Sequence, residues 1–280
     1  MTRHSVKACA GAAVSMKLSG PRRSTRPAWP SAAVIVAVVL VSARARAVDP
    51  FEIQVYDGTA NRAGEFGAEL HANFVASGLP ARPPLLATDH VTHLTLEPSY
   101  GLRPWWELGG YLQAAIRPDG RLDYGGVKLR SKFVTPPGWH SHLRLGVNLE
   151  LSVLPRTYDP DRVGAEVRPI AAWEDDAWLF AINPIVDVPF AGAGAKHGPE
   201  FEPAAMALRK VANVVSLGFE YYAGLGPFSS FEPVRDEQHA LYEAVNLLCV
   251  PRLELNFGVG EGLTRASDHL VLKTIVGYSF

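Results

Sequence analysis

The final residues of the chain, 269–280, constrain its fold more than any other segment. One parity is apolar except for Thr274 and consists of Leu270, Leu272, Val276, Tyr278 and Phe280. The other parity carries His269, Lys273, Gly277 and Ser279. A period of two is the pattern of a β-strand with one apolar and one more polar face. We therefore expect a terminal strand whose apolar face needs nonpolar surroundings.

The amino-terminal region has the three parts of an export signal. Residues 1–30 contain no acidic residue, and their basic residues are Arg3, Lys7, Lys17, Arg22, Arg23 and Arg26. The apolar run at 32–41 is too short to span a bilayer, and Ala45-Arg-Ala47 matches a small-residue cleavage site. We expect a signal peptide at 1–47, with Met16 as an alternative start, and export of the remainder.

Composition narrows the class of the exported chain. Cleavage would leave Cys249 as the one cysteine, so no intramolecular disulfide can form. The formal net charge of −1 argues against a nucleic-acid partner. No later segment approaches the ~18 apolar residues that a spanning helix needs.

Alternation of polar and apolar residues recurs along the rest of the chain. It is most regular at 142–153, and it blurs at 238–248, where a short helix is an alternative. The candidate strands are 65–76, 88–100, 105–117, 123–134, 142–153, 165–174, 178–190, 200–210, 215–224, 238–248, 252–260 and 269–280. Segments of about ten residues match tilted transmembrane strands, although a soluble β-sandwich also alternates. The sequence thus predicts an all-β chain with twelve antiparallel up-and-down strands, a transmembrane β-barrel at 65–280.

Two further features favour the membrane. Aromatic residues are expected at both ends of the strands, as an interfacial belt requires, and five tryptophans lie next to short turns: Trp105, Trp106, Trp139, Trp173 and Trp178. Short and long connections alternate, which is typical of barrels with periplasmic turns and external loops. Residues 51–56 also resemble a strand, but a thirteenth would break the even count of bacterial barrels. We expect 48–64 to lie in the periplasm or to plug the barrel mouth.

The ending at Tyr278 and Phe280 resembles that of outer-membrane β-barrels of Gram-negative bacteria. In that class the ending is an insertion signal that the barrel assembly machinery reads, and the barrel then contacts outer-membrane lipids. The strands Gly125–Phe133 (GGVKLRSKF) and Leu253–Gly260 (LELNFGVG) are similar to strands of uncharacterised proteobacterial barrels of the phenol-degradation meta-pathway transporter-like group. This resemblance implies a passive, porin-like channel for small solutes and assigns neither a solute nor binding residues.

The charged residues on the polar parities are candidates for the lining of the lumen. Acids come from the first three strands and bases from the next two, and further charges follow. The candidates are Glu69, Asp89, Glu97, Glu107, Lys128, Arg130, Lys132, Arg144, Glu150, Glu166 and Arg168. One interpretation is a transverse field that selects polar or anionic solutes. The other is that opposite charges pair and fill a small barrel, which leaves a structural or surface-recognition role for 154–164 and 225–237.

Enzymatic and metal chemistry receive little support from the residues. His140-Ser141-His142 places hydroxyl and imidazole groups together, but no carboxylate is placed by sequence to orient them. A lipid-modifying barrel enzyme is therefore the least favoured alternative. Asp159/Asp161 and Asp175/Asp176 fit turn chemistry, and no His/Cys cluster has ligand spacing. We predict no catalytic residue, no metal and no cofactor.

Overall fold

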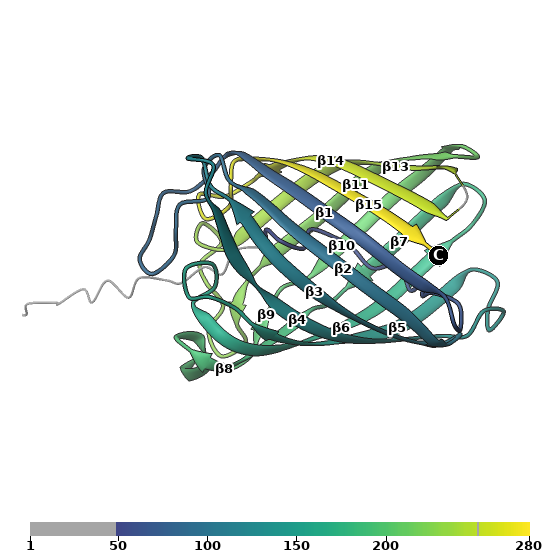
Figure 1. The fold of residues 1–280 in the computed structure, drawn as a ribbon, viewed down its shortest axis with the longest axis horizontal. Coiled ribbons are helices and arrows are strands. Elements are labelled where there is room, and N and C mark those ends of the chain that lie inside the picture. Colours follow the sequence, from purple (N-terminus) through teal and green to yellow (C-terminus); the bar gives the residue numbers. More distant parts are fainter. Residues whose placement is uncertain (1–48, 251) are drawn as a thin grey trace, which may run out of the picture. The chain divides into compact units, whose positions relative to one another are not determined.

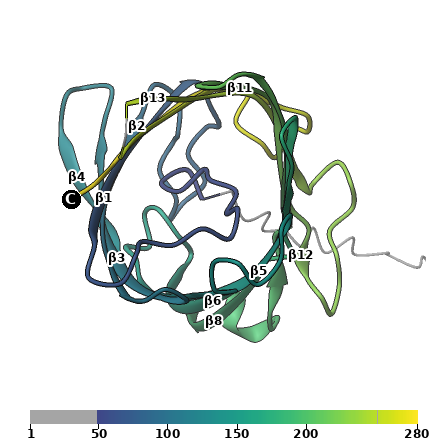
Figure 2. The ribbon, with the colours of Figure 1, turned by 90° about the vertical axis from the view of Figure 1, so that its right-hand side faces the viewer.

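A computed structural model describes residues 49–250 and 252–280, which form one closed antiparallel β-barrel of twelve strands. The expected signal peptide lies outside these residues. The sheet closes because β7, at one end of the strand order, also pairs with β6 (Figures 1 and 2). The strand segments are β1 (Phe66–Ser77), β2 (Thr92–Arg103), β3 (Trp106–Ile116), β4 (Leu122–Val134), β5 (Leu143–Val153), β6 (Asp161–Glu174), β7 (Trp178–Asn183), β8 (Val186–Gly192), β9 (Glu200–Phe201), β10 (Ala204–Ala212), β11 (Val215–Gly224), β12 (Gly226–Pro227), β13 (Gln238–Val250), β14 (Leu253–Gly262) and β15 (Leu270–Ser279). A short 3-10 helix, η1 (Gly194–Lys196), follows β8.

Three neighbouring wall strands are interrupted, which is why fifteen segments make twelve strands. β7 and β8 are separated at Pro184, and β9 and β10 at Pro203. Proline has no N–H to donate to the ladder, so each proline breaks the regular pairing. β11 and β12 are the two segments of the third interrupted strand, which breaks at Leu225. The sequence pattern predicted these strands without their breaks.

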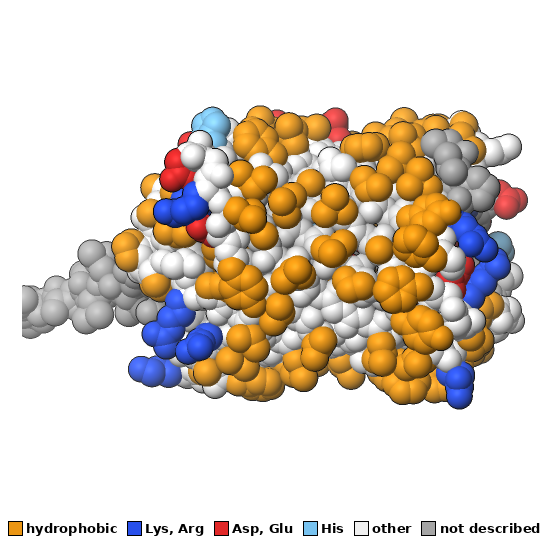
Figure 3. Space-filling view, viewed as in Figure 1, with side chains coloured by type: hydrophobic (Ala, Val, Ile, Leu, Met, Phe, Trp, Pro, Cys, Tyr) orange, Lys and Arg blue, Asp and Glu red, His pale blue; other side chains and the backbone are white. Residues whose placement is uncertain are grey.

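The alternation along the strands separates an apolar exterior from a polar interior, as predicted. Large apolar side chains such as Leu112, Leu129 and Leu151 are exposed on the outside, where they cover the wall between its two rims (Figure 3). Polar neighbours on the opposite parity, such as His71 and Gln113, are buried inside. The blurred segment 238–248 belongs to strand β13 and not to a helix. An apolar outer surface of this extent is suited to lipid.

The two ends of the barrel differ in their connections. At one end, the short-turn end, the turns are 104–105, 135–142, 175–177, 213–214 and the one that contains Arg252. At the other, the long-loop end, the loops are 78–91, 117–121, 154–160, 193–199, 228–237 and 263–269. The turn at 135–142 is longer than predicted and the loop at 117–121 is short. In the described residues no helix is long and apolar enough to span a membrane, a finding that does not bear on strands.

The described tryptophans gather at the short-turn end rather than at both rims. Trp105 and Trp106 stack with centroids 6.1 Å apart, and Phe133 stacks on both rings. Trp178 stacks on Phe180 at 5.4 Å. Because all these rings adjoin the short turns, the tryptophans form one girdle, whereas belts at both ends were expected.

Candidate functional site

Residues 49–64, called here the inner segment, lie within the barrel along its length (Figures 1 and 2). Near the long-loop end, the ring of Phe51 meets that of Tyr158 at 5.4 Å. At the short-turn end, the Gly64 N–H donates to the carbonyl of Gly101 at 2.8 Å. Gly125 permits the close approach of Phe51, because a Cβ at that position would lie 2.7 Å from the ring. The lumen is therefore occupied by the chain's own backbone.

The inner segment alternates, and its two faces meet different parts of the wall. Ile53 and Val55 are buried in an apolar cluster. Their wall partners in this cluster are Val75, Ala172, Ala181, Ile185, Ala204, Met206, Leu208, Tyr222, Ala240, Tyr242, Ala244 and Val271. Most of these residues lie on β7, β10, β11 and β13 or at the breaks beside them, and we call this part the apolar wall.

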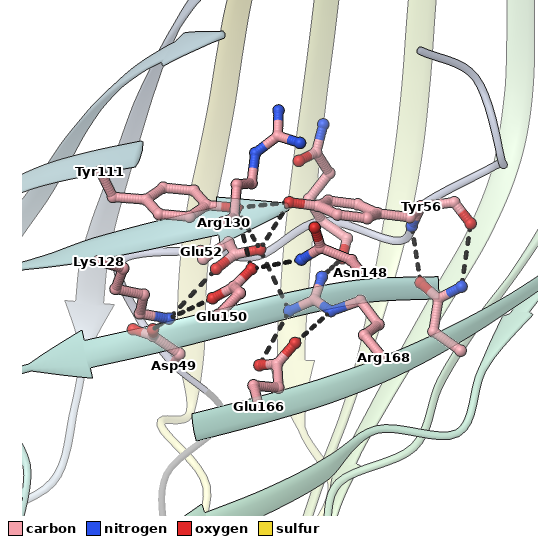
Figure 4. Close-up of polar contacts among 12 residues, drawn as sticks. Asp49, Glu52, Tyr56, Tyr111, Lys128, Arg130, Asn148, Glu150, Glu166 and Arg168 are labelled. Atoms are coloured by element: carbon pink, nitrogen blue, oxygen red, sulfur yellow. Dashed lines mark hydrogen bonds and ion pairs between the residues drawn. The ribbon is translucent and has the colours of Figure 1, made fainter. Parts of the chain in front are cut away.

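The opposite face of the inner segment meets charged side chains of β4, β5 and β6 (Figure 4). The Lys128 Nζ lies 2.7 Å from Asp49 Oδ2 and 3.2 Å from Glu52 Oε2. The Glu52 Oε1 lies 3.1 Å from an Arg168 terminal nitrogen. All of Lys128, Glu52 and Arg168 are buried, so these ion pairs are shielded from solvent. We call strands β2 to β6 the charged wall.

A second group of ion pairs joins β2, β3 and β4. Arg130 lies between two carboxylates, at 2.5 Å from Glu97 and 2.8 Å from Glu107. Lys132 adds a contact of 2.9 Å to Glu107. These strands are adjacent and in register, with Glu107 opposite Lys132 and Gly109 opposite Arg130. Gly109 leaves room for the guanidinium, since a Cβ there would lie 2.8 Å from Arg130 Nε.

Neutral groups also contact the inner segment. The Tyr56 and Tyr111 hydroxyls are 2.6 Å apart, and Tyr111 donates to Glu150 at 3.0 Å (Figure 4). Asn183 binds the backbone of Tyr56 twice, accepting its N–H at 2.7 Å and donating to its carbonyl at 3.0 Å. This pair of bonds fixes the segment at the break between β7 and β8.

The short-turn mouth holds a separate polar group. Arg144 contacts Asp57 of the inner segment at 3.1 Å and also pairs with Glu174. The Lys210 Nζ lies 2.5 Å from Glu174. A cavity of about 430 Å³ opens beside them, lined in part by Thr59, His140 and Lys210. Farther inside, cavities of about 100 and 80 Å³ adjoin the inner segment.

The structure brings most of the predicted lumen residues together around the inner segment. They are Glu69, Glu97, Glu107, Lys128, Arg130, Lys132, Arg144, Glu150, Glu166 and Arg168. Asp89 is the exception: it precedes β2 in the loop 78–91, where it accepts the Gly78 N–H at 2.9 Å. Tyr278 and Phe280 are exposed, and their rings pack edge to face at 5.0 Å.

Sequence reasoning missed the acids that the inner segment supplies, namely Asp49, Glu52 and Asp57. The alternation at 51–56 carried a usable signal. The segment carries apolar residues on one parity and Glu52, Gln54 and Tyr56 on the other. Burial of both faces therefore requires an apolar surface on one side and a polar surface on the other.

Imidazole and hydroxyl groups at the rims have bonding roles. His140 Nδ1 accepts the N–H groups of His142 and Leu143, which shapes the turn. At the long-loop end, Tyr221 and His239 Nδ1 lie 2.5 Å apart, and His239 Nε2 lies 2.9 Å from Glu237. The imidazole of His239, which has Glu237 as a carboxylate partner, thus meets a phenol.

Two of the carboxyl groups in the connections, Asp268 and Asp175, have pKa values shifted in opposite directions. Burial raises the pKa of Asp268, which accepts hydrogen bonds from Thr88 and the Leu79 N–H. Bonds from the backbone N–H groups of Ala177 and Trp178 lower the pKa of Asp175. Both groups stabilise connections at the rims.

Comparisons with known proteins place the fold among outer-membrane barrels. No family model matches the chain, and no curated protein matches its sequence. An outer membrane channel from Pseudomonas putida F1 is similar with a TM-score of 0.54 and 12% identity, over 82% of this chain and 100% of that one. The KdgM porin is similar with a TM-score of 0.52 and 10% identity, over 76% of this chain and 99% of that one. The NanC porin is similar with a TM-score of 0.50 and 7% identity, over 77% of this chain and 98% of that one. All three are named as porins or channels, and at these identities the likeness concerns the fold.

Proposed function

We propose that the chain is a passive outer-membrane channel for small solutes that the inner segment keeps closed in the conformation described here. The closed barrel, its apolar exterior and its likeness in fold to porins and channels support this function. Membership of the phenol-degradation meta-pathway transporter-like group is part of the proposal. So is insertion through the barrel assembly machinery by way of Tyr278 and Phe280.

The observation that carries the proposal is the two-faced contact of the inner segment. Glu52 occupies a pocket with Lys128 and Arg168, while Ile53 packs on the apolar wall. Displacement of the segment would remove one carboxylate partner from each of Lys128 and Arg168, which keep Glu150 and Glu166 on the wall, opposite an apolar surface. Such a lumen is suited to a small solute with one carboxylate and an apolar part, since that solute would replace both contacts.

Single-channel conductance in planar bilayers tests this function. Asn183→Ala removes both hydrogen bonds to the Tyr56 backbone and should raise the open probability. Asn256→Ala is the matched control, because this lumen amide bonds Glu220 and Asn246 on the wall instead. An equal open probability of the two variants and the parent chain would count against closure by the inner segment.

A closed barrel with a structural or surface-recognition role is the second candidate. The number of buried ion pairs between the inner segment and the wall favours it. If Asn183→Ala folds into a heat-modifiable barrel that never conducts, this second role gains support, and the loops around 154–164 and 225–237 become the surfaces to test.

A further inference from the structure

Two carboxylates and one imidazole converge on the lumen face of β1 and β2. Glu69 and Glu97 are direct partners across the two strands, and His71 lies two residues from Glu69 on the same face. Like charges directly opposite each other on a sheet are destabilising. A pair of this kind in a lumen therefore calls for a cation between its members.

Two members of this group, His71 and Glu97, present buried atoms without hydrogen-bond partners, whereas Glu69 Oε2 accepts a hydrogen bond from Gln54. His71 is fully buried, and neither of its ring nitrogens has a hydrogen bond. Its Nε2 lies 3.5 Å from Glu69 Oε2 and 3.5 Å from Glu97 Oε2. Glu97 Oε2 is also buried without a hydrogen bond. Buried polar atoms without partners are rare in folded proteins, and an unfilled ion site is one of their causes.

These separations fit metal ligation better than direct hydrogen bonding. Tetrahedral bonds of about 2.0–2.2 Å place neighbouring ligand atoms about 3.3–3.6 Å apart. The two distances from His71 lie within this range. The three ligand atoms all lie within 4.8 Å of one another. The partly exposed side chain of Glu69 has the freedom to shorten its distance to Glu97.

The surrounding charges leave room for a divalent cation. Arg130 contacts Glu97 through Oε1, so Oε2 of this carboxylate remains directed at His71. Arg130 and Lys132 are the cations that contact Glu97 and Glu107 here. Glu69 is bonded by the neutral amide of Gln54 at 3.2 Å, and Glu254 flanks it across Gly277. The carboxylates of this group thus outnumber its cations.

We propose that Glu69, His71 and Glu97 form a binding site for a divalent first-row transition metal such as Zn²⁺. One imidazole nitrogen and two carboxylate oxygens are a common ligand set for this class of ion. The cavity of about 100 Å³ that Glu69 and Glu97 line provides space for water or solute at a fourth position. Sequence spacing missed the site because its ligands come from two strands.

Zinc titration of the refolded full chain by isothermal calorimetry tests the site. We expect one ion per barrel and binding at least about tenfold weaker in His71→Asn, since one of three ligands is lost. His93→Asn is the matched control. This second buried lumen histidine, on β2, packs against Phe51 at 4.7 Å and should leave zinc affinity unchanged when replaced. Heat-modifiability on gels verifies that each variant is folded.

A spectroscopic measurement keeps the test decisive if His71→Asn fails to fold. Zinc-edge X-ray absorption of the parent chain should then show a first shell of oxygen and nitrogen with one imidazole, and Glu69→Gln should weaken binding. No saturable binding by the folded barrel, equal affinity in His71→Asn, or a shell with several imidazoles would overturn the proposal.

Discussion

The charged wall and the apolar wall hold the same inner segment by different physical means. On the charged wall, Lys128 and Arg168 are buried and contact the carboxylate of Glu52 at 3.2 and 3.1 Å. On the apolar wall, the side chain of Ile53 packs among several apolar side chains. Removing one member of a buried ion pair leaves an uncompensated charge, whereas apolar contacts weaken in proportion to the lost area. The charged wall should therefore be the less tolerant of substitution.

The largest expected effect comes from Arg130→Met on the charged wall. This change leaves Glu97 buried without its cation and removes one of two cations from Glu107. We expect a loss of about 3–5 kcal/mol in the free energy of unfolding. Urea unfolding of lipid-embedded barrels, followed by tryptophan fluorescence, measures it. Arg209→Met, which removes an exposed cation from the Trp178 ring, is the control and should change less than about 1 kcal/mol.

An intermediate effect is expected where the inner segment meets the apolar wall. Ile53 is 2% exposed, and Ile53→Ala should weaken its packing by about 2 kcal/mol or more. If the segment closes the channel, this loss favours the open state by roughly 30-fold. Single-channel open probability measures the shift. An unchanged open probability in a folded variant would show that the charged contacts alone hold the segment.

A smaller effect is expected within the apolar wall itself. Ile185→Val removes one methylene group from a side chain that is 7% exposed beside Pro184. The expected loss is about 1 kcal/mol, because neighbouring apolar groups relax into the space. The same urea unfolding assay measures it. A loss as large as that of Arg130→Met would remove the proposed contrast between the walls.

Much of this fold could be predicted from the sequence because strand parity is a local property. The outward positions of Leu149 and Leu151 and the inward position of Glu150 follow from alternation alone. Pro184 and Pro203 are visible in the sequence and indicate strand breaks. Whether the two breaks lie side by side on neighbouring strands depends on the register of those strands. Register is a property of strand pairs, and one chain read in order does not display it.

The candidate site was less accessible to prediction, for a related reason. Parity identified Lys128 and Arg168 as interior residues, but it did not identify which acids they meet. Their partner Glu52 is separated from them by 76 and by more than 100 positions in the chain. Likewise, Glu69 and Glu97 meet only because β1 and β2 pair in one register.

A final prediction contrasts the interior ion pairs with a carboxyl group at the long-loop rim. Asp268 accepts hydrogen bonds from Thr88 and the Leu79 N–H, and burial raises its pKa. A carboxyl group whose pKa is higher in the folded state binds its proton more tightly there. Its contribution to stability therefore grows as the pH falls from neutral through the raised pKa and is complete below the ordinary value of about 3.9. Asp268→Asn should change stability at neutral pH by no more than about 0.5 kcal/mol and should remove this acidic gain. Unfolding of both chains between neutral and acidic pH measures the difference, and parallel pH curves would show that Asp268 is not the group responsible.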